Sequence, residues 1–399
     1  MSLGKRFRGA RSTKAHFSLA VAALFLLSAC GGSTGPGDGT PPDGNPPDGD
    51  GPPGGPTRGF RMGFTPFPYA ATAEAIDDVY AKLEANGDVI AHHLDGGIPW
   101  PEALAGTPYD PAVEAELADR LARMGPGDVV YLAITPVNSK RSGLADYWGA
   151  SQGLPRPGEW AARDFDSPEV IQAFVGYALD LIDRFGPTWF NYGIEISELA
   201  INDPDAMDRL VSFASQVYPQ IKAAHPELPT FVSVAFKGPG SPGAAEIRDA
   251  FARLLPFSDY VGVSAYPFVF FGHPNAGDPA NLPADWLRQA RDLAPDKPLV
   301  VAETAWIAEP LLIPEFGVNT PADVQDQDDY VERLLSEADA LGAELVIWFF
   351  TVDFDSLWEG LLGRDPVARI WRDTGLWDET LAPRPALTTW QAWLERARR

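Results

Sequence analysis

The sequence predicts a single (β/α)8 barrel over residues 59–399, and three observations support that prediction. Short apolar runs rich in β-branched residues alternate with longer segments of helical periodicity. Eight such alternations follow one another at spacings of roughly 30 to 60 residues, which is the count of an eight-stranded α/β barrel. No low-complexity segment divides these residues, and roughly 340 residues are normal for one barrel.

A doubly wound open sheet is the competing arrangement of alternating strands and helices. Such sheets commonly carry a Gly-x-Gly-x-x-Gly turn after the first strand or a Gly-Lys-Ser/Thr loop. No Gly-x-Gly-x-x-Gly follows the first predicted strand, and no Gly-Lys-Ser/Thr sequence occurs in the chain. The barrel is therefore the favoured fold.

Residues 1–29 have the features of a bacterial secretion signal. Five basic residues precede position 15, no acidic residue occurs before Asp38, and an apolar run covers residues 17–29. That run has the length of a signal-peptide core and is too short to cross a bilayer as a helix. It leads into Leu-Ser-Ala-Cys, which resembles the lipobox of bacterial lipoproteins, and the resemblance implies that Cys30 is acylated and becomes the new N-terminus.

Cys30 is the only cysteine of the chain, so the sequence predicts no disulfide and no cysteine metal site. Gly31 follows it, and within the lipoprotein resemblance a residue other than Asp favours the outer membrane over retention at the inner membrane. We therefore expect a lipid-anchored protein of the cell envelope, on the outer membrane or the cell surface.

Residues 30–58 consist mainly of Gly, Pro, Asp, Ser and Thr, which predicts an extended tether that buries no core. Loss of the signal would leave 26 basic against 55 acidic residues, a net charge of −29. Such an acidic chain argues against nucleic acid or anionic lipid headgroups as partners. It is typical of a solvated extracytoplasmic protein.

The first half of the barrel is marked by helix-end signals and one long loop. The helix over 72–85 ends at Asn-Gly, and the helix over 168–185 is flanked by Ser167 and Gly186. An irregular loop rich in Gly, Trp and Pro covers 139–166. The strands predicted here cover 60–64, 89–92, 129–134 and 189–194, and a further helix covers 111–124.

The second half repeats the alternation of short apolar runs and longer amphipathic segments. The predicted strands cover 230–235, 260–264, 299–302 and 345–349. The predicted helices cover 204–224, 244–255, 283–293 and 321–341, and two final helices cover 367–371 and 388–398.

Glu303 stands where the strand over 299–302 ends. A carboxylate has no reason to end a buried apolar run unless the chain emerges there into a polar cleft. Ligands bind at the carboxyl ends of parallel strands, so Glu303 is the first candidate for chemistry. The alternative is that Glu303 only caps the next helix or pairs with a surface arginine.

Polar and aromatic residues follow the other predicted strands as well. Because the carboxyl ends of barrel strands meet at one face, we expect several of these side chains to share a site. In chain order they are His92, His93, Asp95, Trp100, Asn138, Glu195, Glu198, Lys237, Tyr266, Glu303, Trp306, Trp348 and Asp353.

Two strand-end glutamates three strands apart suit retaining glycoside hydrolysis. One carboxylic acid protonates the leaving oxygen while the other carboxylate attacks the anomeric carbon, and the two groups lie about 5–5.5 Å apart. Glu195 follows the fourth strand and Glu303 the seventh, which face one another across an eight-stranded barrel. Aromatic residues around the rim would supply apolar platforms for sugar rings.

The chain resembles the clan A glycoside hydrolases over roughly residues 60–375. Val-Ala-Glu-Thr-Ala-Trp at 301–306 resembles the Glu-Thr-Gly-Trp of endo-β-1,4-galactanases and its counterpart in some β-mannanases. The segment 259–267 is similar to the sixth-strand segment in which a Tyr touches the nucleophile. Asn-Tyr-Gly-Ile-Glu-Ile at 191–196 is similar to the Gly-Asn-Glu segment that carries the acid/base.

The resemblance implies a (β/α)8 hydrolase with Glu303 as nucleophile and Glu195 as acid/base. Tyr266 would steady Glu303. We expect contacts with the sugar from His93, Trp100, Asn138, Asn191, Tyr266, Trp306 and Trp348.

Ile194 departs from the clan A pattern, in which Asn directly precedes the acid/base and contacts the sugar 2-hydroxyl. Asn191, His93 or Asn138 would have to take over that contact, or the substrate lacks it. Two other possibilities are that Glu198 is the working acid or that activity is lost. Glu195 fits the family spacing and is preferred to Glu198, which would lie about one turn further out.

The histidine and lysine patterns predict no metal and no cofactor. Neighbouring residues on a strand point to opposite faces, so at most one of His92 and His93 faces the cleft, and His93 is favoured. No His-Glu-x-x-His spacing occurs. Lys237 is the only lysine at a strand end, where it pairs with an acid or contacts substrate, and no Schiff-base lysine inside a strand supports a barrel lyase or aldolase.

The sequence therefore predicts a retaining glycoside hydrolase that cleaves a β-linked, galactan-like or mannan-like polysaccharide or oligosaccharide. The alternative is a non-catalytic glycan-binding lipoprotein on a decayed hydrolase barrel, which Ile194 keeps open. The sugar, the choice between endo and exo action and the oligomeric state are not fixed by these residues.

Overall fold

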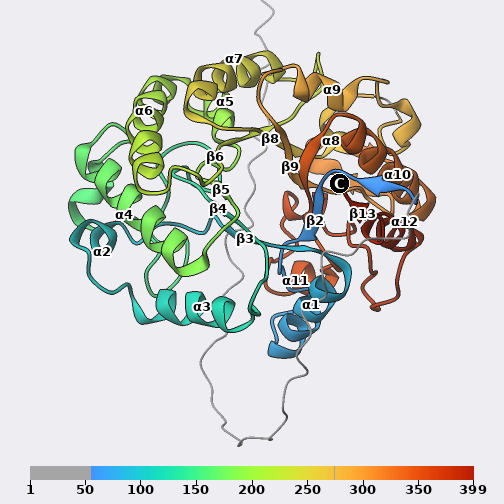
Figure 1. Ribbon diagram of the computed structural model, residues 1–399, viewed down its shortest axis with the longest axis horizontal. Coiled ribbons are helices and arrows are strands. Elements are labelled where there is room, and N and C mark those ends of the chain that lie inside the picture. Colours follow the sequence, from blue (N-terminus) through green and yellow to red (C-terminus); the bar gives the residue numbers. More distant parts are fainter. Residues whose placement is uncertain (1–54, 274) are drawn as a thin grey trace, which may run out of the picture.

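The computed structural model describes residues 55–273 and 275–399. The predicted signal peptide, Cys30 and nearly all of the tether lie outside the described residues. Figure 1 shows the strands in the middle of the molecule with helices around them, and the colours follow one another round this ring. Within the described ranges, no helix has both the length and the apolar character needed to cross a bilayer.

The central sheet is a barrel of parallel strands, in the order β6-β5-β4-β3-β2-β12-β9-β8-β7. β6 and β7 are separated only by Val232, and together they occupy the fifth strand position, so the sheet closes on itself through one interrupted strand. This confirms the predicted barrel, and the open doubly wound sheet is wrong. The strands are β2 (Arg61–Phe64), β3 (Val89–Leu94), β4 (Val130–Ile134), β5 (Trp189–Asn191), β6 (Thr230–Phe231), β7 (Ser233–Ala235), β8 (Val261–Ala265), β9 (Leu299–Thr304) and β12 (Ala343–Trp348).

Alternate strand residues divide between two cores, as the period of two along a strand requires. In β9, Val300 and Ala302 belong to a cluster that fills the barrel. Leu299 and Val301 belong to the larger cluster between the strands and the helices. The inner cluster consists of Val89, Ala91, Tyr131, Ala133, Trp189, Ile194, Phe231, Val300, Ala302, Leu345 and Ile347.

The main helices bury one face each against the strands. α4 begins with Pro at its first position and ends at Gly186, whose φ of 53° is the left-handed conformation that favours glycine. The helices that cover the barrel are α1 (Ala73–Asn86), α3 (Pro111–Ala122), α4 (Pro168–Phe185), α6 (Met207–Ala224), α7 (Ala244–Leu254), α9 (Trp286–Arg291), α10 (Val324–Ala340) and α12 (Pro385–Leu394).

Several short elements were not predicted. An antiparallel hairpin of β10 (Leu311–Ile313) and β11 (Val318–Thr320) follows β9, where a loop was expected. The predicted helix over 367–371 is only a 3-10 turn at Ala368–Ile370. The other additions are the short helices α2 (Trp100–Ala105), α5 (Leu199–Asn202), α8 (Pro267–Phe270) and α11 (Asp355–Glu359).

The two ends of the described chain meet at the face where the barrel strands begin. β1 (Thr57–Arg58) pairs in parallel with β13 (Ala397–Arg398). The Arg58 guanidinium lies 2.8 Å from Asp88, directly before β3, and Gly59 donates its backbone N–H to Asp339 at the end of α10. Both chain ends therefore lie at the opposite face from the carboxyl ends of the strands.

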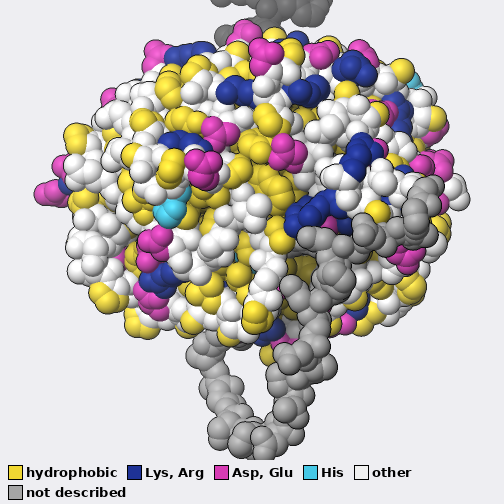
Figure 2. Space-filling model, viewed as in Figure 1, with side chains coloured by type: hydrophobic (Ala, Val, Ile, Leu, Met, Phe, Trp, Pro, Cys, Tyr) yellow, Lys and Arg dark blue, Asp and Glu magenta, His cyan; other side chains and the backbone are white. Residues whose placement is uncertain are grey.

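The surface carries both signs of charge despite the net charge of −24. On the face in Figure 2, acidic and basic side chains are interspersed, with apolar side chains between them. Such mixing favours solubility and gives no single-sign field on this face that would attract a polyelectrolyte.

Candidate active site

Glu303 lies at the carboxyl end of β9, with 1% of its surface exposed. Its Oε1 lies 3.2 Å from Nε2 of His93, and its Oε2 accepts a hydrogen bond of 3.0 Å from the Tyr266 hydroxyl. Burial opposes ionisation, but the His93 contact, Arg141 and the Tyr266 hydroxyl outweigh it and lower the pKa of Glu303. Residues from three strand ends therefore hold Glu303 as a carboxylate.

A register shift aims Glu303 into the barrel mouth. Strict alternation along β9 would place Glu303 on the same side as Leu299 and Val301, facing the helices. However, Val263 and Ser264 of β8 pair with Val301 and Glu303, so β9 carries one extra residue at this point. Such an insertion changes the direction of the following side chains, and Glu303 points at His93 instead of the helix layer.

His93 contacts Glu303, while its neighbour His92 points away. His93 Nδ1 lies 3.8 Å from Asp95, and its ring packs edge-on against Phe349 at 5.0 Å. Burial lowers the pKa of His93, but Glu303 and then Asp95 raise it by more. His92 instead packs against Phe185 of α4, in the layer between strands and helices.

Glu195 follows β5 by four residues and has 3% of its surface exposed. Its φ of 50° places it in the left-handed region, and its backbone N–H donates to the Ser233 hydroxyl at 3.1 Å. Its Oε2 accepts a hydrogen bond of 3.4 Å from Arg141. Burial and the nearby charge of Glu303 raise the pKa of Glu195 well above its usual range, despite Arg141.

Glu198 forms an ion pair with Lys237, with 2.9 Å between Oε1 and Nζ. Both side chains are largely buried, and the ammonium group lies 5.0 Å from the centroid of the Phe270 ring. This ion pair occupies one of the two Glu198 carboxylate oxygens. Glu195, whose pKa is raised, is the better proton donor of the two glutamates.

Arg141 is a site residue that the sequence analysis missed. It has 1% of its surface exposed, and it lies in the turn 138–143 after β4. Asn138, expected to contact substrate, accepts hydrogen bonds in this turn: its carbonyl from Arg141 N at 2.8 Å and its side chain from Ser142 N at 3.0 Å. No periodicity or spacing marks an irregular loop, so the position of Arg141 depends on the tertiary path of the chain.

Asn191 lies inside the barrel and has no exposed surface, which corrects the expectation of a sugar contact. Its side-chain amide donates to the Tyr131 hydroxyl at 3.0 Å and to the Ser233 hydroxyl at 3.2 Å. The Ser233 hydroxyl also accepts from the backbone N–H of Glu195, so Asn191 helps to fix the backbone of Glu195 through Ser233. Ile194 likewise belongs to the core inside the barrel, so its side chain does not reach a ligand.

The three tryptophans expected as sugar platforms are fully buried, which corrects that expectation. Trp306 stacks on Tyr330 with 4.4 Å between ring centroids, and Trp100 stacks on Trp160 at 5.7 Å. A ring packed in the core has no face left for a sugar. The indole N–H groups of Trp100, Trp306 and Trp348 donate to the carbonyls of Ala145, Gly277 and Thr374.

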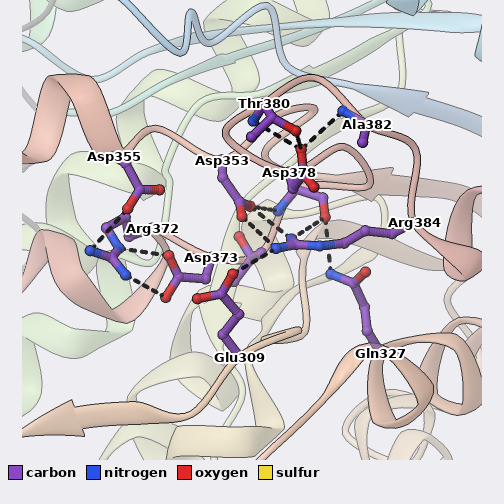
Figure 3. Close-up of polar contacts among 12 residues, drawn as sticks. Glu309, Gln327, Asp353, Asp355, Arg372, Asp373, Asp378, Thr380, Ala382 and Arg384 are labelled. Atoms are coloured by element: carbon purple, nitrogen blue, oxygen red, sulfur yellow. Dashed lines mark hydrogen bonds and ion pairs between the residues drawn. The ribbon is translucent and has the colours of Figure 1, made fainter.

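Asp353, singled out at the end of the eighth strand, belongs to a network of acids and arginines (Figure 3). Arg384 lies 2.6 Å from Asp353, and Arg372 lies 3.0 Å from Asp355. In each of two groups here, three carboxylates lie close together. Arg384 pairs with Glu309 and Asp353, and Arg372 pairs with Asp355 and Asp373. The network joins parts of the loop after β12, and the two arginines compensate the charge of these four acids. The two groups are Glu309, Asp353 and Glu379, and Asp353, Asp355 and Asp373.

The comparisons with known proteins show the fold. No protein-family model matches the chain, and no curated protein matches its sequence. An exo-β-1,4-mannosidase from Opitutaceae bacterium strain TAV5 is similar in structure, with a TM-score of 0.56 and 15% identity over 86% of this chain and 60% of that chain. This chain therefore spans about three fifths of the length of that mannosidase.

Two further solved structures share the architecture. A GH5_18 protein from Bifidobacterium longum, determined with Manβ1-4GlcNAc, has a TM-score of 0.56 and 14% identity, covering 84% of this chain and 77% of its own. Xylanase 10B from Thermotoga maritima has a TM-score of 0.54 and 12% identity, covering 84% and 95%. The chain thus has the (β/α)8 fold of clan A glycoside hydrolases.

Proposed function

We propose that this protein is a retaining glycoside hydrolase, with Glu303 as nucleophile and Glu195 as acid/base. One observation carries the proposal: two buried glutamates interact in one site, and their surroundings move their pKa values in opposite directions. His93 and Tyr266 keep Glu303 ionised, and burial beside that charge keeps Glu195 protonated. Pairs of this kind assign the acid and the base of an active site.

In the first step, a Glu303 oxygen attacks the anomeric carbon as the bond to the leaving oxygen breaks. Glu195 gives its proton to that oxygen, so the products are a glycosyl ester on Glu303, a released alcohol and a Glu195 carboxylate. Both Glu303 oxygens are already in hydrogen-bonding contact, which orients the carboxylate, and each keeps a second lone pair for attack.

In the second step, the Glu195 carboxylate takes a proton from water, whose oxygen attacks the anomeric carbon. The ester bond breaks, Glu303 leaves as a carboxylate, and Glu195 is protonated again. Esterification has removed the negative charge of Glu303, which is one cause of the raised pKa of Glu195. The pKa of Glu195 therefore falls when a base is needed.

A β-mannoside is the first substrate to test. Two of the similar structures are described as an exo-β-1,4-mannosidase and as a complex with Manβ1-4GlcNAc. The sequence around Glu303 predicted a galactan-like or a mannan-like substrate, and these names favour the mannan-like one. Galactan, xylan and glucan are the next polymers of the panel.

The experiment is a time course of reducing-end release by the full chain on β-mannan, β-galactan, xylan and β-glucan. Proton NMR of the first product gives its anomeric configuration, and we expect retention. Glu303→Gln should abolish release from the polymer that the wild type cleaves. Unchanged hydrolysis by that variant would sink the assignment.

Rescue by azide distinguishes Glu195 from Glu198 as the acid/base. An aryl glycoside with a good leaving group needs no acid in the first step, and azide can replace water in the second. We expect azide to restore turnover in Glu195→Gln and not in Glu198→Gln. Rescue of Glu198→Gln instead would move the acid/base role to Glu198.

A non-catalytic glycan-binding protein is the second candidate, and the buried Ile194 is the observation that favours it. Its position leaves the acid without the preceding Asn side chain that clan A enzymes commonly use. Binding of an oligosaccharide without cleavage during a long incubation would support this candidate.

The cell-envelope location is also part of the proposal, and the residues around Cys30 support it. Metabolic labelling with a fatty-acid analogue should mark the wild type in a bacterial host. Cys30→Ser should remain unlabelled and leave the membrane fraction. Equal labelling of both proteins would contradict a lipid anchor at Cys30.

A further inference from the structure

Arg141 is a buried arginine that the two-glutamate mechanism does not use. With 1% of its surface exposed, it is among the largest side chains that the fold covers completely. Its φ of 50° is unusual for a residue with a side chain, and Glu195, its partner, has the same φ. Strained backbone at two contacting residues is a reason to ask what the contact does.

The guanidinium of Arg141 is held at two points. Its Nη1 donates to the Asn138 carbonyl at 3.3 Å, and its Nη2 donates to Oε2 of Glu195 at 3.4 Å. Its Nε has no hydrogen-bond partner among the described residues. A planar group fixed in this way can recognise one oxygen of a carboxyl group and not the other.

A guanidinium nitrogen can only donate, so Oε2 of Glu195 must accept. When Glu195 is protonated, its proton then resides on Oε1, since a proton on Oε2 would oppose the N–H group of Arg141. We propose that Arg141 is a positioning residue for Glu195, which reserves Oε2 and so keeps the transferable proton on Oε1. This inference rests on the proposed acid/base role of Glu195.

Arg141 remains charged in both steps, so the transferred proton moves only between Glu195, the leaving oxygen and water. In the first step the proton on Oε1 passes to the leaving oxygen, and Arg141 then faces a full carboxylate. In the second step Oε1 takes a proton from water, and Oε2 again accepts from Arg141. The contact is therefore present in both protonation states and is stronger in the ionised one.

Four charged groups near Glu195 shift its pKa. Glu303 and Glu198 disfavour its ionised form, whereas Arg141 and Lys237 favour it. Lys237 is committed to Glu198 at 2.9 Å, which leaves Arg141 as the cation in direct contact with the acid. The full set comprises Arg141 after β4, Glu198, Lys237 after β7, Tyr266 after β8 and Glu303 in β9, with His93 and Asp95 behind Glu303.

The turn that carries Arg141 does not depend on its guanidinium alone. The backbone N–H of Arg141 donates to the Asn138 carbonyl, and Asn138 N donates to the Gly143 carbonyl at 2.9 Å. The Asn138 side chain adds a bond from Ser142 N. Removal of the guanidinium should therefore leave the turn in place and change the surroundings of Glu195.

The test compares Arg141→Met, Arg141→Lys and the control Lys140→Met in the full chain. Lys140 lies on the same turn, is exposed, and is not among the groups that shift Glu195. The first readout is the pH profile of kcat/KM on an aryl glycoside with a poor leaving group. In Arg141→Met, Glu195 loses an opposite charge in direct contact, so its pKa should rise. We therefore expect the basic limb of the profile to move up by about 1 to 3 pH units.

Arg141→Lys separates charge from geometry. An ammonium group retains the charge but offers no planar fork, so its basic limb should stay within about half a pH unit of the wild type. Its kcat should still fall by roughly tenfold for poor leaving groups, and by much less for good ones, because general acid catalysis is the impaired step. Lys140→Met should match the wild type in both respects.

A second readout does not need turnover. The infrared band of the protonated Glu195 carboxyl, assigned by its absence in Glu195→Gln, is titrated in folded wild type and in Arg141→Met. An upward shift of its midpoint in the variant supports the inference, and an unchanged midpoint overturns it. If the wild type cleaves no glycan while the band shifts, the proposed function fails and the Arg141–Glu195 contact stands.

Discussion

Oε1 of Glu303 lies 3.2 Å from Nε2 of His93, although two strands, β2 and β12, separate β9 from β3 in the sheet. The contact therefore reaches across the barrel mouth. Tyr266, from the neighbouring β8, occupies the other oxygen of Glu303. Together the two contacts fix the orientation of the carboxylate and favour its ionised form.

Removal of His93 should move the acidic limb of the pH profile. Activity requires ionised Glu303, and His93 lowers the pKa of Glu303, so His93→Gln should raise that pKa. The acidic limb of kcat/KM should then shift to higher pH by about one unit. Tyr266→Phe, which removes a hydrogen bond and no charge, should shift it less. An unmoved limb in His93→Gln would contradict the role of His93.

The wild type should show a bell-shaped pH dependence. Activity falls as pH drops through the lowered pKa of Glu303, because the nucleophile becomes protonated. It falls again as pH rises through the raised pKa of Glu195, because the acid loses its proton. With an aryl glycoside of good leaving group, Glu195→Gln should lose the basic limb. A basic limb that persists in this variant would have to come from another group.

Glu303→Gln should lose activity by roughly 10⁴-fold or more, since no covalent intermediate can form. The fold should persist, because an amide fills the same volume and still accepts from Tyr266. Circular dichroism and the urea midpoint check the fold alongside the rate. If unfolding accompanies the loss of activity, Glu303→Asp provides a second variant. It retains the negative charge, but its shorter side chain places the carboxylate further from the substrate.

Trp306→Phe should cost stability and leave substrate binding unchanged. The ring stacks on Tyr330, and its N–H donates to the Gly277 carbonyl at 3.0 Å. A smaller ring leaves a cavity and an unpaired carbonyl, so the free energy of unfolding should fall by about 1–3 kcal/mol. Urea denaturation measures that loss. A large rise in KM at unchanged stability would restore the platform role.

His92 should make the protein sensitive to acid. It is fully buried, its ring nitrogens have no partner in the described part of the chain, and burial lowers its pKa well below the usual value. In the unfolded chain it takes up a proton below about pH 6.5, whereas the folded form stays neutral. Stability should therefore fall by up to about 1.4 kcal/mol per pH unit, from about pH 6.5 down to the lowered pKa.

Denaturation at several pH values compares His92→Phe with the control His273→Gln, whose histidine is exposed. The first variant should flatten the decline between about pH 6.5 and 5, and the second should not. Equal slopes in all three proteins would show that His92 is not the group responsible.

The strand count and the strand-end position of Glu303 were predictable because they depend on local patterns. Short apolar runs mark β9 and its neighbours, and a charge at the end of such a run is conspicuous. The direction of Glu303 was not predictable, since the register shift between β8 and β9 involves pairing partners about 40 residues apart. Without that shift, simple alternation would have turned the carboxylate toward the helices.

The prediction that three tryptophans act as sugar platforms was wrong for a different reason. A Trp after a strand can form the rim of a cleft or lie beneath a loop, and its own sequence does not distinguish these. Trp348 is covered because Tyr330 of α10 and Trp390 of α12 pack against its ring, and the carbonyl of Thr374 accepts its indole N–H. Arg141 was missed because a charged residue in an irregular loop is usually solvated. Only the fold shows that the turn 138–143 buries its side chain against Glu195.

The pairing of β1 with β13 has a practical meaning for handling the protein. Thr57 and Ala397 are partners in register, so a segment attached directly before Thr57 or after Arg399 starts from the face where the barrel strands begin. Immobilisation on a bead or fusion to another protein at either of these two points would present Glu303 and Glu195 toward free solution. A long polymer could then approach from the open side without crossing the support.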